Sequence, residues 1–420
     1  MISVEGHVEP GWGSVAEEFR KTFESYGEVG AALSVYQTGR PVVDLWAGIA
    51  DKRSGRAWND DTVAVVFSTT KGATAICAHM LVEQGKLNLD APVAQYWPAF
   101  AGAGKEKVLV RHLLSHQAGL VLIDAKLTTE DACAWNPVIR ALESQKPLWP
   151  AGSQVMYHSL TFGFLIGELV RRVTGMTLGA FFADAVAAPL GLDAWIGLPI
   201  EIRPRVAHLE PATDQLDSLT LFVRAMQRLG KNTPEIREAY AAVISVMEAP
   251  ESPYMRDDLG GSFPFLVTED GYHNDPAVWG AELPSTNLIS DARSLARMYA
   301  ATIGTIDGVR LLNPETVATM STVTSTDVPR YGMPVPGTDG LPAAAQTAMD
   351  LYQARYSLGF WSPFPAMPLL GPRSFGHPGF GGSLAFADPD AEIALGYVPN
   401  HMGSDLRRTR DITAAITRLL

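Results

Sequence analysis

The strand patterns of this chain lie at its two ends, and this placement limits the folds that it can adopt. Near the N-terminus, residues 30–50 alternate as two strands around the turn Gln37-Thr38-Gly39-Arg40. Near the C-terminus, residues 382–387 and Ile393–Pro399 flank a turn at Asp388-Pro389-Asp390. The simplest arrangement joins strands from both ends in one antiparallel sheet, with the long middle of the chain packed against it.

The middle of the chain has a different texture. Over residues 87–284, short helices alternate with loops rich in Pro and Gly, and strand signals are few. We therefore predict an α+β fold, in which an α/β sandwich with a central antiparallel sheet is joined to a largely helical domain. Residues 1–85 and 286–420 would form the sheet domain and residues 86–285 the helical insert, with an active site in the cleft between them.

Apolar residues at helical spacing predict the main helices. The helix that follows Ser68 is expected to end near Gln84, with Gly85 as its cap. Another is expected over residues 287–303, with Ser290 or Asp291 near its start. Further helices are predicted over residues 14–24, 159–174, 177–188, 219–229 and 234–247, and near the C-terminus after Ser404.

Composition and charge exclude several classes of protein. Of the 420 residues, 47% are hydrophobic and 19% are charged, which is typical of a globular chain. With 33 basic and 45 acidic residues, the formal net charge is −12. An acidic chain without a basic run argues against a nucleic-acid partner. No apolar run approaches the roughly 20 residues that span a membrane.

The N-terminus and the cysteines bear on the compartment. Residues 1–18 lack a basic start followed by an apolar core, so no secretory signal is visible. Cys77 and Cys133 do not form a metal-binding spacing, and a disulfide is not expected without export. We therefore predict a cytoplasmic protein that has neither a metal nor another cofactor and takes a small molecule as its partner.

A serine and a lysine stand three residues apart in Phe67-Ser68-Thr69-Thr70-Lys71-Gly72. On a helix these two positions share one face, so Lys71 is expected beside the Ser68 oxygen. A serine needs a neighbouring base to act as a nucleophile, and a lysine serves only if its pKa falls well below about 10.4. Burial and the positive end of a helix dipole both lower that pKa. The structural alternative is that Ser68 only caps the helix.

Two distant segments carry further candidates. Tyr157 follows the loop Trp149-Pro150-Ala151-Gly152 and precedes a predicted helix, a position from which a side chain can project into a cleft. A phenol beside a lysine ammonium loses its proton more readily and can act as a general base, whereas the alternative is a buried tyrosine bonded to backbone. The glycines of residues 376–383 indicate either close approach to the backbone or a tight turn between strands.

Together these segments resemble the three motifs of the serine β-lactamase and penicillin-binding-protein superfamily. Ser68-Thr69-Thr70-Lys71, Tyr157-His158-Ser159 and His377-Pro378-Gly379 occur in the order and approximate spacing of those motifs. Within the superfamily the chain looks most like the β-lactamase-like carboxylesterases of family VIII, which are relatives of class C β-lactamases. Supporting stretches are residues 42–48, 113–120 and 375–389.

The resemblance implies a β-lactamase-like fold and a role for each matching residue. It makes Ser68 the nucleophile, Lys71 the group that assists its deprotonation, and Tyr157 the general base that passes the proton on. The backbone N–H groups of Ser68 and Phe380 would form the oxyanion hole. Whether Lys71 or Tyr157 takes the first proton stays open, because the two should titrate as a coupled unit.

Two positions depart from the lactamase pattern. Ser159 stands where the lactamases have Asn, and His377 stands where they have the lysine of Lys-Thr-Gly. That lysine would attract a substrate carboxylate, and a neutral His377 does so poorly. The expected substrate is therefore an uncharged ester, contacted by Ser159, His377 and Gly379. Weak β-lactam hydrolysis stays an open alternative, because acyl transfer uses the same groups.

Other candidate motifs are weaker. His112 and His116 stand four residues apart, as two zinc ligands do, but the glutamate of His-Glu-x-x-His is missing. No serine has the Gly-x-Ser-x-Gly frame of a Ser-His-Asp esterase. Gly102-Ala103-Gly104-Lys105 lacks the full spacing of a phosphate loop and is interpreted as a surface loop.

The favoured hypothesis is a serine hydrolase that cleaves carboxylic esters through an acyl-enzyme. The first alternative is an acyltransferase, an amidase or a β-lactamase on the same scaffold. The second is a non-catalytic binding protein, which the joint presence of Ser68, Lys71 and Tyr157 disfavours.

Overall fold

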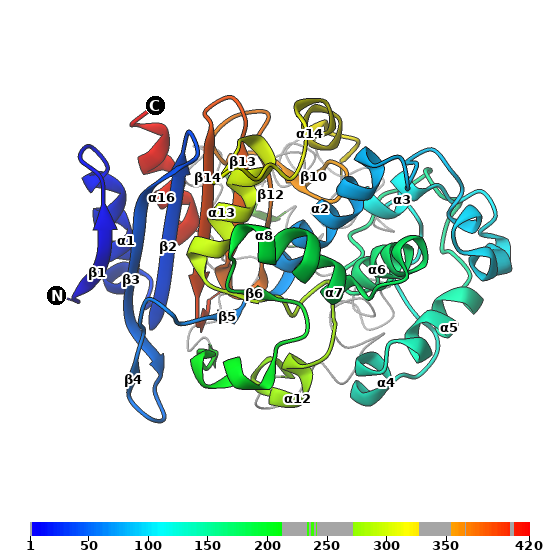
Figure 1. Cartoon of the computed structure of the whole chain (residues 1–420), viewed down its shortest axis with the longest axis horizontal. Coiled ribbons are helices and arrows are strands. Elements are labelled where there is room, and N and C mark those ends of the chain that lie inside the picture. Colours follow the sequence, from blue (N-terminus) through cyan, green and yellow to red (C-terminus); the bar gives the residue numbers. More distant parts are fainter. Residues whose placement is uncertain are drawn as a thin grey trace.

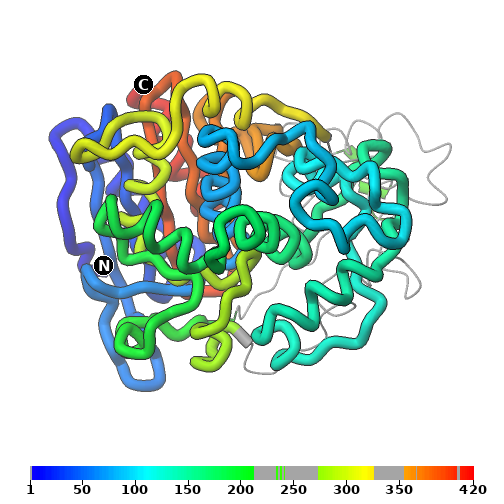
Figure 2. Tube along the Cα trace, turned by 45° about the vertical axis from the view of Figure 1, so that its right-hand side comes forward, coloured from blue at the N-terminus to red at the C-terminus, as the bar shows by residue number. Residues whose placement is uncertain are grey.

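The computed structural model describes residues 2–211, 272–326, 354–365, 367–403 and 407–420, together with a few positions between 233 and 241. A large antiparallel sheet occupies one side of the molecule, and the helices of residues 110–174 gather on the other (Figure 1 and Figure 2). The predicted α+β class with a central antiparallel sheet is confirmed.

The main sheet contains ten strands within the described residues. They are β1 Val4–Val8, β2 Gly30–Gln37, β3 Arg40–Asp51, β4 Arg56–Ala57, β9 Ser325–Thr326, β10 Arg355–Tyr356, β11 Trp361–Ser362, β12 Phe375–Pro378, β13 Leu384–Asp388 and β14 Ile393–Pro399. Their order across the sheet is β1-β3-β2-β14-β13-β12-β11-β10-β9, and β4 pairs with β3. Two smaller sheets are formed by β5 Ala64–Val65, β6 Ala194–Trp195 and β8 Ile289–Ser290, and by β7 Glu210–Pro211 and β15 His401–Met402.

Strands from the two ends of the chain meet at the centre of the main sheet. β2 and β14 pair antiparallel, with Leu33 opposite Tyr397 and Ala31 opposite Pro399. Each also belongs to a hairpin, β2 with β3 and β13 with β14. The arrangement inferred from the terminal strand patterns is therefore the observed one.

Helices cover the sheet and build the rest of the molecule. Within the described residues they are α1 Gly13–Ser25, α2 Thr70–Glu83, α3 Val110–Leu114, α4 Thr129–Cys133, α5 Asn136–Ser144, α6 Thr161–Thr174, α7 Leu178–Phe182, α8 Ala188–Leu190, α12 Pro276–Trp279, α13 Ala292–Ile303, α14 Pro314–Ser321 and α16 Arg407–Thr417. Glycines follow two of these helices. Gly85, the expected cap, follows α2 with a φ of 69°, and Gly175 follows α6 with a φ of 77°.

The two faces of the sheet belong to separate hydrophobic cores. Leu33 and Val35 of β2 pack in a core that includes residues of α1 and α16. Ala32 and Tyr36, which alternate with them, pack in the core that contains α2 and α13. Successive strand residues point to opposite faces, so β2, buried on both, reads as an apolar run. This second core extends into α6. The helix that follows Ser68, α2, is therefore packed between the sheet and the helical side.

One predicted helix begins later than expected. Over residues 287–303, Ile289–Ser290 forms β8 between β5 and β6, and α13 begins only at Ala292. Asp291 caps it, with its carboxylate accepting a 2.6 Å hydrogen bond from the Ser294 N–H. Pairing with two short strands from distant parts of the chain decides this boundary, which local pattern does not reveal.

The helices predicted over residues 219–229 and 234–247, and the Ser404 cap, lie outside the described residues. The domain boundaries predicted after residues 85 and 285 stay a prediction.

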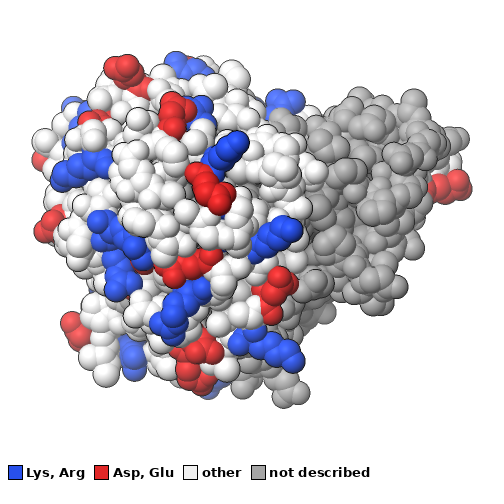
Figure 3. Space-filling model, turned by 90° about the vertical axis from the view of Figure 1, so that its right-hand side faces the viewer, with Lys and Arg blue, Asp and Glu red and all other residues white. Residues whose placement is uncertain are grey.

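On the helical side of the molecule, basic and acidic side chains are interspersed (Figure 3). No single described helix is long and apolar enough to cross a membrane, although α6 and the Leu178–Leu190 segment, bent by 72°, satisfy the length and hydropathy criteria as a pair.

Candidate active site

Ser68 lies in a tight turn between a short strand and a long buried helix. β5 ends at Val65, a 3₁₀ helix spans Phe67–Thr69, and α2 follows directly. Phe67 has a φ of 47°, a left-handed conformation that is costly for an aromatic residue. Its ring contacts those of His273 and Phe380, with centroids 5.2 Å and 5.7 Å away. These contacts hold the backbone that presents Ser68.

Lys71 is fully buried beside Ser68, as the spacing predicts. Its Nζ lies 3.0 Å from Ser68 Oγ and 3.1 Å from the carbonyl oxygen of Ser285, to which it donates. The same Nζ lies 4.9 Å from the centroid of the Tyr157 ring. Sequence reasoning missed Ser285, whose backbone role leaves no sequence signal.

Tyr157 is surrounded by aromatic and histidine side chains. Its ring packs against those of His116, Tyr356 and His377, with centroids 4.9 Å, 6.1 Å and 5.8 Å away. Its hydroxyl lies 3.4 Å from Nε2 of His377. The structure thus brings the second and third predicted motifs together beside Lys71.

The histidines of this cluster are neutral. Burial, followed by the nearby Lys71 charge, holds the pKa of His377 well below its ordinary value. Burial also holds the pKa of His116 far down and lowers that of His158 to about 4. The prediction that His377 carries no charge agrees with these surroundings.

The proton of His377 is assigned by its backbone partner. Nδ1 lies 2.6 Å from the carbonyl oxygen of Pro378, which can only accept, so Nδ1 carries the hydrogen. In a neutral ring Nε2 is then an acceptor, and the Tyr157 hydroxyl donates to it. His377 therefore orients Tyr157 by accepting a hydrogen bond from its hydroxyl. A lysine at position 377 would instead donate one. Ser159 lies half-buried in the turn between Tyr157 and α6.

The Ser68 turn is fastened directly to the end of strand β12. Ser383 Oγ donates to the carbonyl oxygen of Val66 at 2.7 Å and lies 3.0 Å from Thr69 Oγ1. Thr69 Oγ1 in turn lies 3.2 Å from the carbonyl oxygen of His377. Both hydroxyls stand inside segments that the sequence singled out, but their mutual contact spans 314 residues and is visible only in the fold.

The two proposed oxyanion donors both lie in the first turn of short 3₁₀ helices. Ser68 belongs to Phe67–Thr69 and Phe380 opens Phe380–Gly382. N–H groups in a first turn have no acceptor within their own helix. Gly379 has no room for a side chain, because a Cβ there would lie 2.3 Å from the carbonyl oxygen of Val66. The backbone of β12 therefore approaches the Ser68 turn as closely as the glycines suggested.

A second lysine is buried at a different place. Lys105 is fully covered, and its Nζ donates to the carbonyl oxygens of Glu143 and Gln145 at 2.9 Å and 2.6 Å. The interpretation of residues 102–105 as a surface loop is correct for Gly102 and Gly104 but wrong for Lys105. Its acceptors come from the end of α5, far along the chain.

The two histidines considered as zinc ligands, His112 and His116, form hydrogen bonds with different parts of the backbone. Nδ1 of His112 accepts from the N–H of Leu109, whereas Nδ1 of His116 accepts from the N–H of His158. Each ring is thus bonded to a different part of the backbone.

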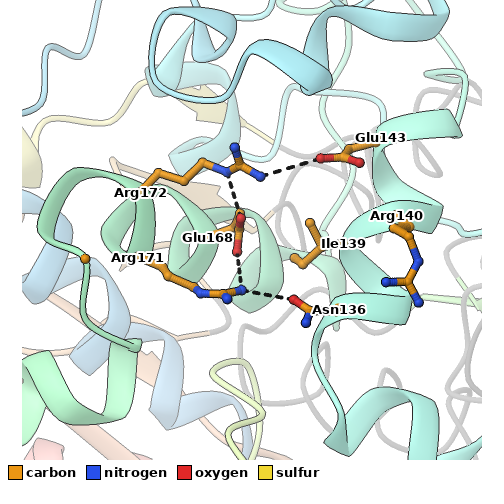
Figure 4. A pocket seen from close by; sticks show the side chains of 8 residues that line it. Asn136, Ile139, Arg140, Glu143, Glu168, Arg171 and Arg172 are labelled. Carbon is orange, nitrogen blue, oxygen red and sulfur yellow. Dashed lines mark hydrogen bonds and ion pairs between the residues drawn. The ribbon is translucent and has the colours of Figure 1, made fainter.

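A pocket of about 420 Å³ between α5 and α6 lies apart from Ser68. Several of its polar groups bond one another: Arg172 Nε donates to buried Glu168 at 2.7 Å, and Arg171 Nη1 donates to the Asn136 side-chain oxygen at 3.1 Å (Figure 4). It is lined by Asn136, Ile139, Arg140, Glu143, Glu168, Arg171, Arg172 and Gly175.

A nucleophile-type serine bonded to a buried lysine, on an antiparallel sheet with a helical flank, is the arrangement of serine hydrolases related to β-lactamases. The chain belongs to the Beta-lactamase family, whose model matches residues 15–418. The superfamily inferred from the three motifs is thereby confirmed, and with it the class of serine hydrolase.

Individual relatives agree in sequence and fold. The chain is 32% identical over 412 residues to "Esterase/beta-lactamase LipL" of Mycobacterium tuberculosis (strain ATCC 25618 / H37Rv), covering 96% of this chain and 84% of that protein. A family VIII carboxylesterase superposes with a TM-score of 0.78 and 31% identity, covering both chains completely. EstA from Arthrobacter nitroguajacolicus Rue61a gives a TM-score of 0.74 and 29% identity, covering 98% of this chain and 97% of that one.

Proposed function

We propose that this protein hydrolyses uncharged carboxylic esters through an acyl-enzyme formed on Ser68. The observation that carries the proposal is the 3.0 Å contact between Lys71 Nζ and Ser68 Oγ in a buried setting. The names of its relatives, an esterase/beta-lactamase and a family VIII carboxylesterase, point to the same substrate class.

In the first half of the reaction, Ser68 Oγ bonds to the ester carbonyl carbon. The serine proton passes to the Lys71 and Tyr157 pair, and the alkoxide leaves with a proton from that pair. The negative charge that develops on the carbonyl oxygen faces the N–H groups of Ser68 and Phe380. In the second half, water loses a proton to the same pair and attacks the acyl carbon. The bond between that carbon and Ser68 Oγ then breaks, Ser68 takes the proton back from the pair, and the acid leaves.

The surroundings of His377 support an uncharged substrate. In lactamases the equivalent lysine would meet a substrate carboxylate, but here a neutral, buried ring is committed to Pro378 and Tyr157. A substrate carboxylate would find no cation at that position, so its desolvation would be poorly compensated. Ser159 and Gly379 stay proposed as further substrate contacts.

The test is an activity profile over p-nitrophenyl esters of rising acyl length, with nitrocefin beside them. We expect ester turnover to exceed nitrocefin turnover, and Ser68→Ala to abolish both. A Ser68→Ala variant that keeps the wild-type ester rate would overturn the proposal. Adding an alcohol or an amine separates hydrolysis from acyl transfer, because a transferase would form the new ester or amide as its main product. The predicted cytoplasmic location is checked separately by cell fractionation.

A further inference from the structure

A fully buried arginine of the C-terminal helix α16 contacts the glycine loop after β12, residues 379–382. Arg408 of α16 is 1% exposed, and its Nη2 donates to the carbonyl oxygens of Gly381 and Gly403 at 2.6 Å and 2.8 Å. Its Nη1 donates to the carbonyl oxygen of His401 at 3.2 Å. One guanidinium thus bonds three backbone carbonyls around the loop.

A buried carboxylate anchors that guanidinium. Arg408 Nη1 donates to Glu28 Oε2 at 2.6 Å, and neither side chain of this pair is exposed to solvent by more than 1%. The Tyr397 hydroxyl donates to the same oxygen at 2.5 Å. Removing two charges from water is expensive unless they are paired and hydrogen-bonded, so the pair fixes Arg408 in one place. The planar fork of arginine can bond a carboxylate and several carbonyls at once, which a lysine ammonium cannot do in the same geometry.

The loop that Arg408 holds has little rigidity of its own. Phe380 is flanked by Gly379 and by two consecutive glycines, Gly381 and Gly382, with φ values of 80° and 96°. Glycine is the residue with the most conformational freedom, so this turn must be held by its contacts. These contacts include the Gly379 N–H bond to the Ser383 carbonyl oxygen at 2.8 Å, the Gly382 N–H bond to Gly379 at 3.0 Å, the Phe380 ring against Phe67, and the Arg408 bond to Gly381. A Cβ at Gly382 would lie 2.3 Å from Arg408 Nη2, so the arginine occupies the space beside the loop.

We infer that Arg408, anchored by Glu28, is a positioning residue for the oxyanion donor at Phe380. This inference rests on the proposed function, in which the Phe380 N–H stabilises the oxyanion. Arg408 fixes the carbonyl direction of Gly381, and this sets the tilt of the turn that contains the Phe380 N–H. It touches neither substrate nor reacting atoms and acts only through the loop.

The test compares an ester with its thionoester, in which sulfur replaces the carbonyl oxygen. Sulfur accepts hydrogen bonds weakly, so the thionoester gains less from an oxyanion hole. The ratio of the two kcat/KM values therefore reports the alignment of the donors. Arg408→Lys keeps the charge beside Glu28 but loses the fork. We expect it to lower ester kcat by about 10- to 100-fold with little change in KM, and to reduce the ratio by about tenfold.

A second variant and a matched control complete the design. Glu28→Gln keeps Arg408 but weakens its anchor, so the ratio should fall by a smaller factor, about threefold; this variant carries the test if Arg408→Lys fails to fold. Arg172→Lys alters another arginine paired with a buried glutamate, Glu168, far from the loop. It should lower stability and leave the ratio unchanged.

Two outcomes separate this inference from the proposed function. If Ser68→Ala is inactive and the folded Arg408 and Glu28 variants keep the wild-type ratio, the positioning role is wrong and the esterase proposal stands. If Ser68→Ala retains ester turnover, the proposed function itself is wrong.

Discussion

Lys71 and Lys105 are both fully buried, and of these two only Lys71 faces a reactive group. Lys105 donates to two carbonyl oxygens at the end of α5 and lies over the Phe100 ring. Lys71 donates to one carbonyl oxygen and to Ser68 Oγ, and lies over the Tyr157 ring. Burial of a lysine is thus no sign of catalysis by itself. Lys71 differs from Lys105 because one of its partners, the Ser68 hydroxyl, can lose a proton.

The largest expected effect separates the two lysines directly. Lys71→Ala should lower kcat/KM for a p-nitrophenyl ester by at least about 10³-fold, because Ser68 loses the group that assists its deprotonation. Lys105→Met should keep kcat/KM near the wild-type value. Steady-state kinetics on both variants checks this. A similar fall of kcat/KM in the two variants would contradict the different roles assigned to Lys71 and Lys105.

The Tyr157 hydroxyl is the next group to test. Tyr157→Phe keeps the ring that Lys71 lies against and removes only the proton-transfer oxygen. We expect kcat to fall by about 10²- to 10³-fold with the fold intact, as for loss of a general acid–base group. Tyr356→Phe, in the adjacent stacked ring, is the matched control and should have little effect. Wild-type kcat in Tyr157→Phe would assign the proton transfer to Lys71 alone.

The neutral residue at position 377 predicts a change in substrate preference. His377→Lys would place a cation at position 377, where it could meet a substrate carboxylate. We expect the ratio of nitrocefin to ester kcat/KM to rise about tenfold, the effect of one charge-assisted hydrogen bond. His377→Gln, which stays neutral, should show no such rise. An equal rise in both variants would mean that charge is not the cause.

The smallest effects concern the stability role of Lys105. Lys105→Met leaves two buried carbonyls without a donor, which should lower the free energy of unfolding by about 1–3 kcal/mol. Burial lowers the pKa of Lys105 from its ordinary 10.5, so the folded state releases this proton more readily than the unfolded state. Its contribution to stability therefore rises with pH in the window just below 10.5. Urea unfolding at several alkaline pH values should show a flatter rise in the variant, and an identical rise would contradict this assignment.

The sequence predicts some of these features and not others, for physical reasons. Strand periodicity at both ends predicts the joined sheet, because strand faces alternate locally. The Ser68 and Lys71 pair is predictable because both lie within one helical turn. Backbone partners such as the Ser285 carbonyl leave no residue-type signal. The burial of Lys105 and the loop contacts of Arg408 depend on acceptors that only the fold brings near.

The central claim is that Ser68 carries the acyl group, and mass spectrometry tests it most directly. The protein would be mixed with a slowly deacylating ester, quenched in acid and digested. The account predicts an added acyl mass on the peptide that contains Ser68, absent in Ser68→Ala and strongly reduced in Lys71→Ala but present in Lys105→Met. An acyl adduct on another residue, or ester turnover with no adduct in any state, would contradict it.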